Sequence, residues 1–149
     1  MTQSLVDRLT GRALHPRARE IAEAPAEARG FDCLRGRKYC LLVTFRRDGR
    51  PVPTPVWFGI DGDSLYIRSE ESTGKVKRIR REPRARIAPC NARGKPLGPP
   101  VEASARIVGG SEEERAERAL ASSYGLGRRI YERFLAAPGG AYIEVRPRG

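Results

Sequence analysis

Apolar residues that recur with a period of two constrain the fold of this 149-residue chain more than any other feature. Leu41, Val43 and Phe45 alternate with the residues between them, and the pair Asp48-Gly49 that follows is typical of a hairpin turn. The chain then returns, turns at a second Asp-Gly pair and leaves again. We therefore predict a meander of three strands over residues 38–45, 51–60 and 64–69.

Short helices and further strands fill the second half of the chain. Pro83 ends a helix predicted over residues 74–82, and Ser111 with Glu114 three residues later forms a capping box that opens another. Six strands with few, short helices favour a mainly β fold, a β-barrel of antiparallel strands. The remaining predicted elements are strands over residues 84–90, 101–108 and 141–146, a Gly/Pro-rich loop over 91–100, a helix over 111–123, and a helix that carries Ile130, Phe134 and Leu135.

The first 30 residues have a different pattern from the rest. Stretches that favour helix, at residues 4–9 and 18–24, are interrupted by glycine and proline, so we expect loosely attached helix there. We therefore predict an N-terminal helical extension over residues 1–33, followed by a barrel domain over residues 34–149.

The charge of the chain points to an anionic partner. Lys and Arg number 29 against 18 Asp and Glu, which gives a net charge of +11. Nucleic acid, an acidic membrane surface and a small polyanion are all compatible with that excess. No stretch approaches the roughly 20 apolar residues of a membrane span, and the N-terminus has neither a continuous apolar segment nor a small-residue cleavage site. We therefore expect a cytoplasmic protein.

The cysteines and the single histidine exclude several kinds of chemistry. Cys33, Cys40 and Cys90 form no close pair, and His15 is the one histidine of the sequence. We therefore expect no metal site and no His-based triad. We expect Cys90 to be a small buried residue. Chemistry would then come from a cofactor, and the sequence identifies no catalytic residue.

Two segments are candidates for binding that cofactor. In the first, RPVPTPVWF, prolines stand at positions 51, 53 and 55 and remove alternate N–H donors, which predicts an edge strand. Taken alone, the pattern favours protection against edge-to-edge aggregation over a second interpretation, in which it leaves room for a ligand beside the strand.

The second segment, STGKVKRIRREPRAR, begins a helix at residues that suit a phosphate. Thr73 is a good N-cap, Gly74 permits close backbone approach, and Lys75 lies in the first turn. Two alternatives are a solvated basic helix and a nucleic-acid patch. Against the second, Tyr66 is the one aromatic nearby, and no series of stacking aromatics accompanies the basic residues.

The order of these motifs resembles that of the split β-barrels related to pyridoxamine-phosphate oxidase, which have the FMN-binding-like fold. More narrowly, YCLLVTFRRDGRPVPTPVWF and TGKVKRIRREPRARIAPCNARGKPLGP are similar to the actinobacterial branch of oxidoreductases that depend on the deazaflavin coenzyme F-420. The resemblance covers about residues 34–146. It implies a homodimer in which two subunits share each cofactor site, with residues 91–97 of the partner closing it.

The resemblance also implies which residues contact the cofactor. One strand would line the ring system, the end of the next would lie beside the ribityl and phosphate region, and the helix start would clamp the phosphate. These residues are, in that order, Pro53, Thr54, Pro55 and Val56; Arg68 and Ser69; and Thr73, Gly74 and Lys75, supported by Lys77 and Arg78. One departure concerns Gly74, because flavin mononucleotide (FMN) members often have an arginine just before the lysine.

The implied function is hydride transfer from reduced F-420 to a small organic substrate. The phosphodiester and glutamate tail of F-420 match a basic groove better than FMN does. No proton donor is identified among Tyr66, Tyr124 and Tyr131. The alternatives are an FMN-binding, haem-binding or non-catalytic F-420-binding barrel. A nucleic-acid-binding module ranks after these, and we expect no specific nucleic acid partner.

Overall fold

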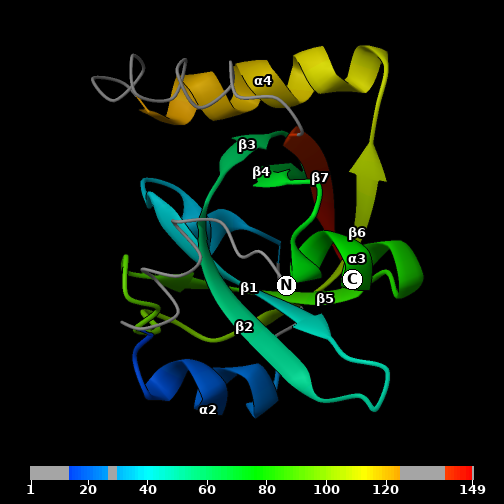
Figure 1. Cartoon of the computed structure of the whole chain (residues 1–149). Helices are drawn as coiled ribbons and strands as arrows, with labels where there is room; N and C mark the ends of the chain where they lie inside the picture. The colour runs from blue at the N-terminus through cyan, green and yellow to red at the C-terminus, as the bar shows by residue number, and fades with distance from the viewer. Residues whose placement is uncertain (1–13, 27–29, 125–139, 149) are drawn as a thin grey trace.

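A computed structural model describes residues 14–26, 30–124 and 140–148 of the chain (Figure 1). Over these residues the strands form one seven-stranded antiparallel sheet, in the order β2-β1-β5-β6-β7-β4-β3, which curls into a half-barrel. The predicted mainly β fold is confirmed. The strands are β1 (Tyr39–Phe45), β2 (Pro51–Trp57), β3 (Gly59–Asp61), β4 (Ser64–Glu70), β5 (Arg84–Cys90), β6 (Val101–Val108) and β7 (Gly140–Pro147).

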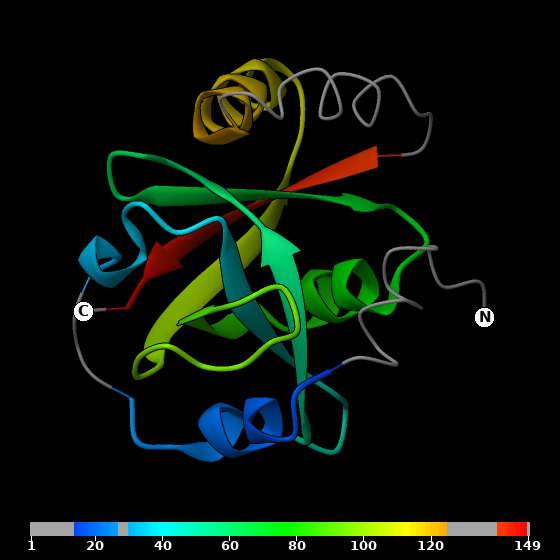
Figure 2. The same ribbon diagram turned by 90° about the vertical axis from the view of Figure 1, so that its left-hand side faces the viewer.

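The helices lie around this sheet. α2 and α4 cover opposite outer sides of it, as both Figures 1 and 2 show, and α3 packs beside β1 and β6. None of the helices in the described ranges is long and apolar enough to cross a membrane. The predicted helix around residues 130–135 lies outside the described residues. The helices are α2 (Arg17–Glu23), the short 3-10 helix η1 (Asp32–Leu34), α3 (Gly74–Arg81) and α4 (Ser111–Tyr124).

The predicted three-strand meander is wrong in one respect. β1 and β2 form the expected hairpin, but the next strand breaks at Phe58, and β3 pairs with β4 at the other edge of the sheet. β4 then pairs with β7 and has no ladder with β2. The chain crosses from one edge of the sheet to the other at Phe58, whose side chain is buried in the main core. The break at this residue thus accompanies the closure of the half-barrel.

β2 is an edge strand, as its prolines predicted. Pro51, Pro53 and Pro55 stand opposite Phe45, Val43 and Leu41 of β1 in an unbroken register. Proline has no N–H to donate, so the ladder bonds to β1 must run through the residues between the prolines.

β1 is buried on both faces. Cys40 and Leu42 face the main core, whereas Leu41 and Val43 belong to a second cluster that packs under α2. α2 is also held by polar contacts, because the buried Arg86 of β5 donates hydrogen bonds of 2.6 and 2.5 Å to the carbonyls of Ala22 and Ala24. The expectation of loose attachment is thus wrong for Arg17–Glu23.

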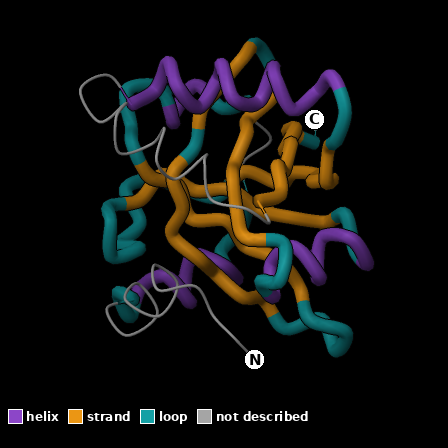
Figure 3. The backbone as a smooth tube through the Cα atoms, turned by 45° about the horizontal axis from the view of Figure 1, so that its top comes forward, coloured by secondary structure: helices purple, strands orange, loops and turns teal. Residues whose placement is uncertain are grey.

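α4 lies directly on the sheet, over β3, β4 and β7 (Figure 3). Its backbone comes so close to Gly59 that a Cβ atom there would overlap the carbonyl group of Ala119. Tyr66 and Tyr142 of the sheet pack against Ala116 and Leu120 of the helix in a third buried cluster. The prediction of this helix from its sequence pattern is confirmed.

Candidate functional site

The start of α3 is held in place by its two apolar residues. Val76 and Ile79 are buried in the main core, three residues apart on one face of the helix. Lys75, next to Val76, is also buried, with 6% of its surface exposed, while Lys77 is exposed. The basic segment is therefore no uniformly solvated helix, because one of its cations is packed into the fold.

Thr73 occupies the N-cap position, as predicted, but its hydroxyl does not cap the helix. The Thr73 Oγ1 atom donates to the carbonyl of Glu70 at 2.9 Å and lies 2.9 Å from Ser69 Oγ. The hydroxyls of Ser69 and Thr73 are both buried and bind each other where β4 leads into α3. This local network leaves the first-turn amides of α3 without a side-chain cap from Thr73.

Arg78 folds back over the start of its own helix. Its Nε atom donates a 2.7 Å hydrogen bond to Oγ1 of Thr44, a buried residue of β1. A Cβ atom at position 74 would lie 2.6 Å from Arg78 Nη1, so Gly74 is what admits the guanidinium there. The structure thus brings Gly74 and Arg78 together, and adds Thr44. Sequence reasoning missed Thr44, because its link to Arg78 spans 34 residues.

The first turn of α3 is positively charged. The N-terminus of a helix carries the positive end of its dipole, and the first turn of α3 contains no acidic residue. Lys75 and the guanidinium of Arg78 add two cations to the same turn. A helix N-terminus with exposed amides and adjacent cations attracts anions, phosphate groups above all.

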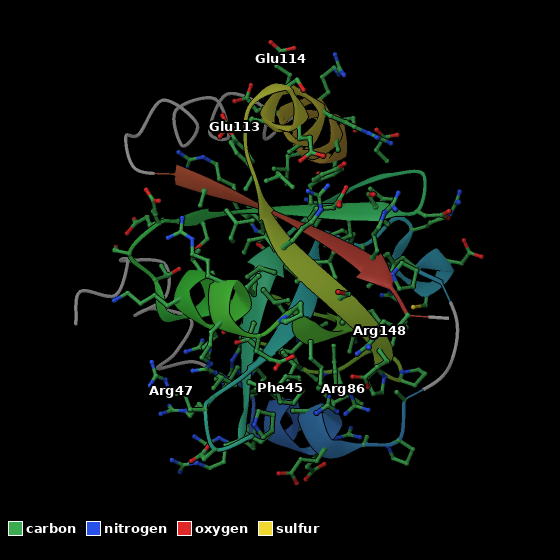
Figure 4. All side chains as sticks on the ribbon, turned by 90° about the vertical axis from the view of Figure 1, so that its right-hand side faces the viewer. Phe45, Arg47, Arg86, Glu113, Glu114 and Arg148 are labelled. Carbon is green, nitrogen blue, oxygen red and sulfur yellow. The ribbon has the colours of Figure 1, made fainter. Side chains whose placement is uncertain are left out.

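Further arginines extend this basic region onto the hairpin between β1 and β2. Arg81 donates a 2.6 Å hydrogen bond to the carbonyl of Phe45, and the Arg84 guanidinium stands 4.2 Å above the Phe45 ring. Figure 4 shows Phe45 and, at the hairpin tip, Arg47 on the side of the molecule where α3 lies. The hairpin tip also contains the exposed Arg46.

The two predicted residues at the end of β4 lie on opposite faces of the sheet. Ser69 is paired with Ala141 and faces the main core, near Thr73. Arg68 is paired with Tyr142 on the face that α4 covers, and its guanidinium lies against Gly140. The structure therefore brings Ser69 to the start of α3 but not Arg68, whose role at a cofactor stays a prediction.

The predicted residues of β2 are divided in the same way. Residues directly opposite in an antiparallel pair share a face. Thr54 stands opposite Leu42 and so shares the inner face with Thr44, and Val56 packs on the main core. Pro53 and Pro55 stand opposite Val43 and Leu41, on the face toward α2.

Cys90, Trp57 and Tyr66 have defined surroundings. Cys90 is buried, and burial raises the pKa of its thiol to about 12, which confirms it as a small core residue. Trp57 is 37% exposed and forms a tilted ring pair with Tyr39 at 6.1 Å between centroids. The Tyr66 hydroxyl donates to Glu144, and burial raises the pKa of Tyr66. The side chains of Tyr124 and Tyr131 lie outside the described residues.

Comparison with known protein families gives one match. The model of the family described as pyridoxamine 5'-phosphate oxidase matches residues 24–147, which is most of the chain and includes all seven strands. No curated protein matches the sequence significantly.

Solved structures resemble this one at low sequence identity. A haem-binding protein from Mycobacterium smegmatis has a TM-score of 0.63 and 18% identity, covering 91% of this chain and 53% of its own. HutZ, the haem storage protein from Vibrio cholerae, has a TM-score of 0.61 and 14% identity, covering 91% of each chain. An F-420 reductase has a TM-score of 0.51 and 21% identity, covering 85% of this chain and 97% of its own. At such identities the likeness shows the shared fold.

Proposed function

Because this chain belongs to the pyridoxamine 5'-phosphate oxidase family, we propose that it binds coenzyme F-420 and acts as an F-420-dependent oxidoreductase. The observation that carries the proposal is the cationic start of α3, where Lys75 and the guanidinium of Arg78 lie at a helix N-terminus. Such a cluster suits the phosphodiester of the coenzyme. That the protein is cytoplasmic stays a prediction.

The residues at the start of α3 fit a phosphate group by their chemistry. Gly74 keeps the backbone open to close approach, and the first-turn amides receive no cap from Thr73. Arg78 offers a planar fork of donors, and Lys75 a compact ammonium. Of the other predicted residues, Thr54 and Val56 are partly exposed on the inner face and would contact the rest of the coenzyme, whereas the buried Ser69 would act through its bond to Thr73.

The charge around the site favours F-420 over FMN. FMN ends in one phosphate, whereas F-420 continues from its phosphodiester into a tail of glutamates. The exposed Arg46, Arg47 and Lys77, and Arg81 on the hairpin side of α3, extend the positive region beyond the phosphate clamp. A chain of carboxylates gains from several such cations, while a single phosphate cannot reach them.

The bound deazaflavin would supply two-electron hydride transfer. The protein would bind the coenzyme, orient its ring toward the substrate and exclude water from the reacting face. No side chain of this chain is assigned the role of proton donor, and the substrate is a small organic molecule of unassigned structure.

Absorbance titration of the purified protein tests the proposal. F-420, FMN and haem are added in separate experiments, and the oxidation of reduced F-420 is then followed with candidate acceptors. We expect saturable binding of F-420 at micromolar concentration or below, and weaker binding of FMN. Tight binding of haem or FMN with none of F-420 would replace the proposal with the corresponding alternative. Binding of F-420 without any oxidation of its reduced form would indicate a non-catalytic carrier.

A further inference from the structure

We infer that Thr44 is a positioning residue, which fixes the Arg78 guanidinium over the start of α3 and so completes the phosphate clamp. The inference rests on the proposed function and assigns a part to a residue on β1 that the sequence pattern does not single out. Its basis is one hydrogen bond and one close approach, Arg78 Nε to Thr44 Oγ1 at 2.7 Å and Arg78 Nη1 over Gly74.

Thr44 is suited to hold a guanidinium without neutralising it. Its side chain is almost fully buried, with 1% of the residue exposed, so the hydroxyl has a fixed position on the inner face of β1. A hydroxyl accepts the Nε–H bond but carries no charge. A carboxylate at the same place would form an ion pair with Arg78 and reduce its attraction for a second anion. Thr44 therefore helps to set the direction of the guanidinium and adds no opposing charge of its own.

Gly74 provides the complementary half of the arrangement. A Cβ at this position would lie 2.6, 3.4 and 3.6 Å from Nη1, Cζ and Nη2 of Arg78, so any larger residue would displace the planar group. Residues four apart lie on the same side of a helix, which brings Arg78 back above Gly74. The guanidinium thus occupies the space that a side chain at position 74 would otherwise fill. Gly74, Arg78 and Thr44 form one unit.

This unit is consistent with the departure at position 74 that the family resemblance implies. In this chain the second cation of the clamp is Arg78, one turn later in the helix. A long arginine side chain has many rotamers, so an anchor outside the helix is needed to fix its position. The anchor is Thr44, which lies near the end of β1, the strand that packs beside α3. Loss of the anchor would leave the charge in place and remove one hydrogen bond that orients it.

The test measures dissociation constants for F-420 and, by competition, for inorganic phosphate. Thr44→Val has nearly the shape of threonine but no hydroxyl, and we expect it to weaken binding of F-420 about 3- to 10-fold, the scale of one hydrogen bond. Thr44→Ser retains the acceptor and should bind within twofold of wild type. Gly74→Ala should weaken binding by displacing the same guanidinium. The KM for F-420 should rise in Thr44→Val while kcat stays near the wild-type value.

The decisive experiment repeats Thr44→Val and Gly74→Ala in an Arg78→Ala background. If Thr44 and Gly74 act through Arg78, neither substitution weakens binding further once the guanidinium is gone. Equal losses with and without Arg78, or a Thr44→Ser variant as weak as Thr44→Val, would overturn the inference. If wild type binds neither F-420 nor phosphate, the proposed function fails instead. Thermal melting of each variant separates loss of binding from loss of fold.

Discussion

Glu144 and Arg106 stand opposite each other on β7 and β6, and the Arg106 Nε atom donates a 2.9 Å hydrogen bond to Glu144 Oε1. The other carboxylate oxygen accepts hydrogen bonds of 3.1 Å from Ser64 Oγ and from the Tyr66 hydroxyl of β4. Arg106 also binds Glu112 at the start of α4 through both Nη atoms. One buried carboxylate therefore links three strands to the helix that covers them.

The stability of the protein should depend on the charge of Glu144. Burial acts to raise the pKa of Glu144, but hydrogen bonds from Arg106, Tyr66 and Ser64 outweigh it and lower the pKa below the ordinary 4.5. A pKa lowered by folding adds stability above the unfolded-state pKa, and this is lost as the pH falls through the folded-state value. Urea unfolding of wild type and Glu144→Gln should therefore differ most near pH 7, and less at about pH 3.

The matched control for this prediction is Glu113→Gln. Glu113 is exposed on α4, as Figure 4 shows, and its substitution should leave the free energy of unfolding within about 0.5 kcal/mol of wild type. An equal gap between wild type and Glu144→Gln at both pH values would contradict the assignment of a charged carboxylate to this network.

Binding of F-420 should be lost in a graded way at the clamp. Lys75→Met keeps the buried stem and removes the ammonium, and should weaken binding by about 1.5–3 kcal/mol, the scale of a charge-assisted hydrogen bond. Arg78→Ala should cost somewhat less. Arg118→Ala, exposed on α4, should cost almost nothing. Fluorescence titration measures all three, and equal losses would indicate general electrostatics in place of a clamp.

Salt should distinguish a coenzyme site from a nucleic-acid surface. Binding of an oligonucleotide should be weak, independent of sequence and gone by about 0.2 M salt, because a few scattered phosphate contacts lose affinity rapidly there. Binding of F-420 should fall less, since ring burial and backbone hydrogen bonds are not screened. A tight oligonucleotide complex at about 0.15 M salt that excess F-420 does not displace would favour the nucleic-acid alternative.

Gly59→Ala should be strongly destabilising. The added Cβ would overlap the backbone of Ala119, so α4 would have to move away from β3. Overpacking of this kind costs about 1–3 kcal/mol or more, measured as the free energy of unfolding in urea. Gly109→Ala is the control, because its added Cβ would meet no atom within 4 Å and should change stability little. Similar losses in the two variants would argue against close packing of α4.

We expect a two-fold symmetric homodimer, because the resemblance implies a cofactor site shared by two subunits. Leu97, 42% exposed in the loop after β5, lies within the segment expected to close the partner's site. Light scattering at micromolar concentration should give roughly twice 16.5 kDa, and Leu97→Glu should shift the protein toward monomer. A wild-type mass near 16.5 kDa would be incompatible with the shared site.

Local signals in the sequence predicted local structure well. The Thr73-Gly74-Lys75 start of α3 and the edge position of β2 follow from residue chemistry within a few positions, and the structure has both. The break at Phe58 could not be predicted this way, because apolar residues continue on both sides of it and only closure of the sheet requires it. The pairing of Thr44 with Arg78 depends equally on that closure.

The anchoring of α2 by Arg86 has a consequence for how the chain is made. Ala22 precedes Arg86 by 64 residues, so the segment that becomes α2 leaves the ribosome before Arg86 has been synthesised. Seven residues are too few to remain helical in isolation. α2 can therefore form only after β5 has joined β1 and supplied both Arg86 and the apolar surface beneath it. The first described element to emerge during synthesis therefore becomes ordered later than β1 and β5, which follow it in the chain.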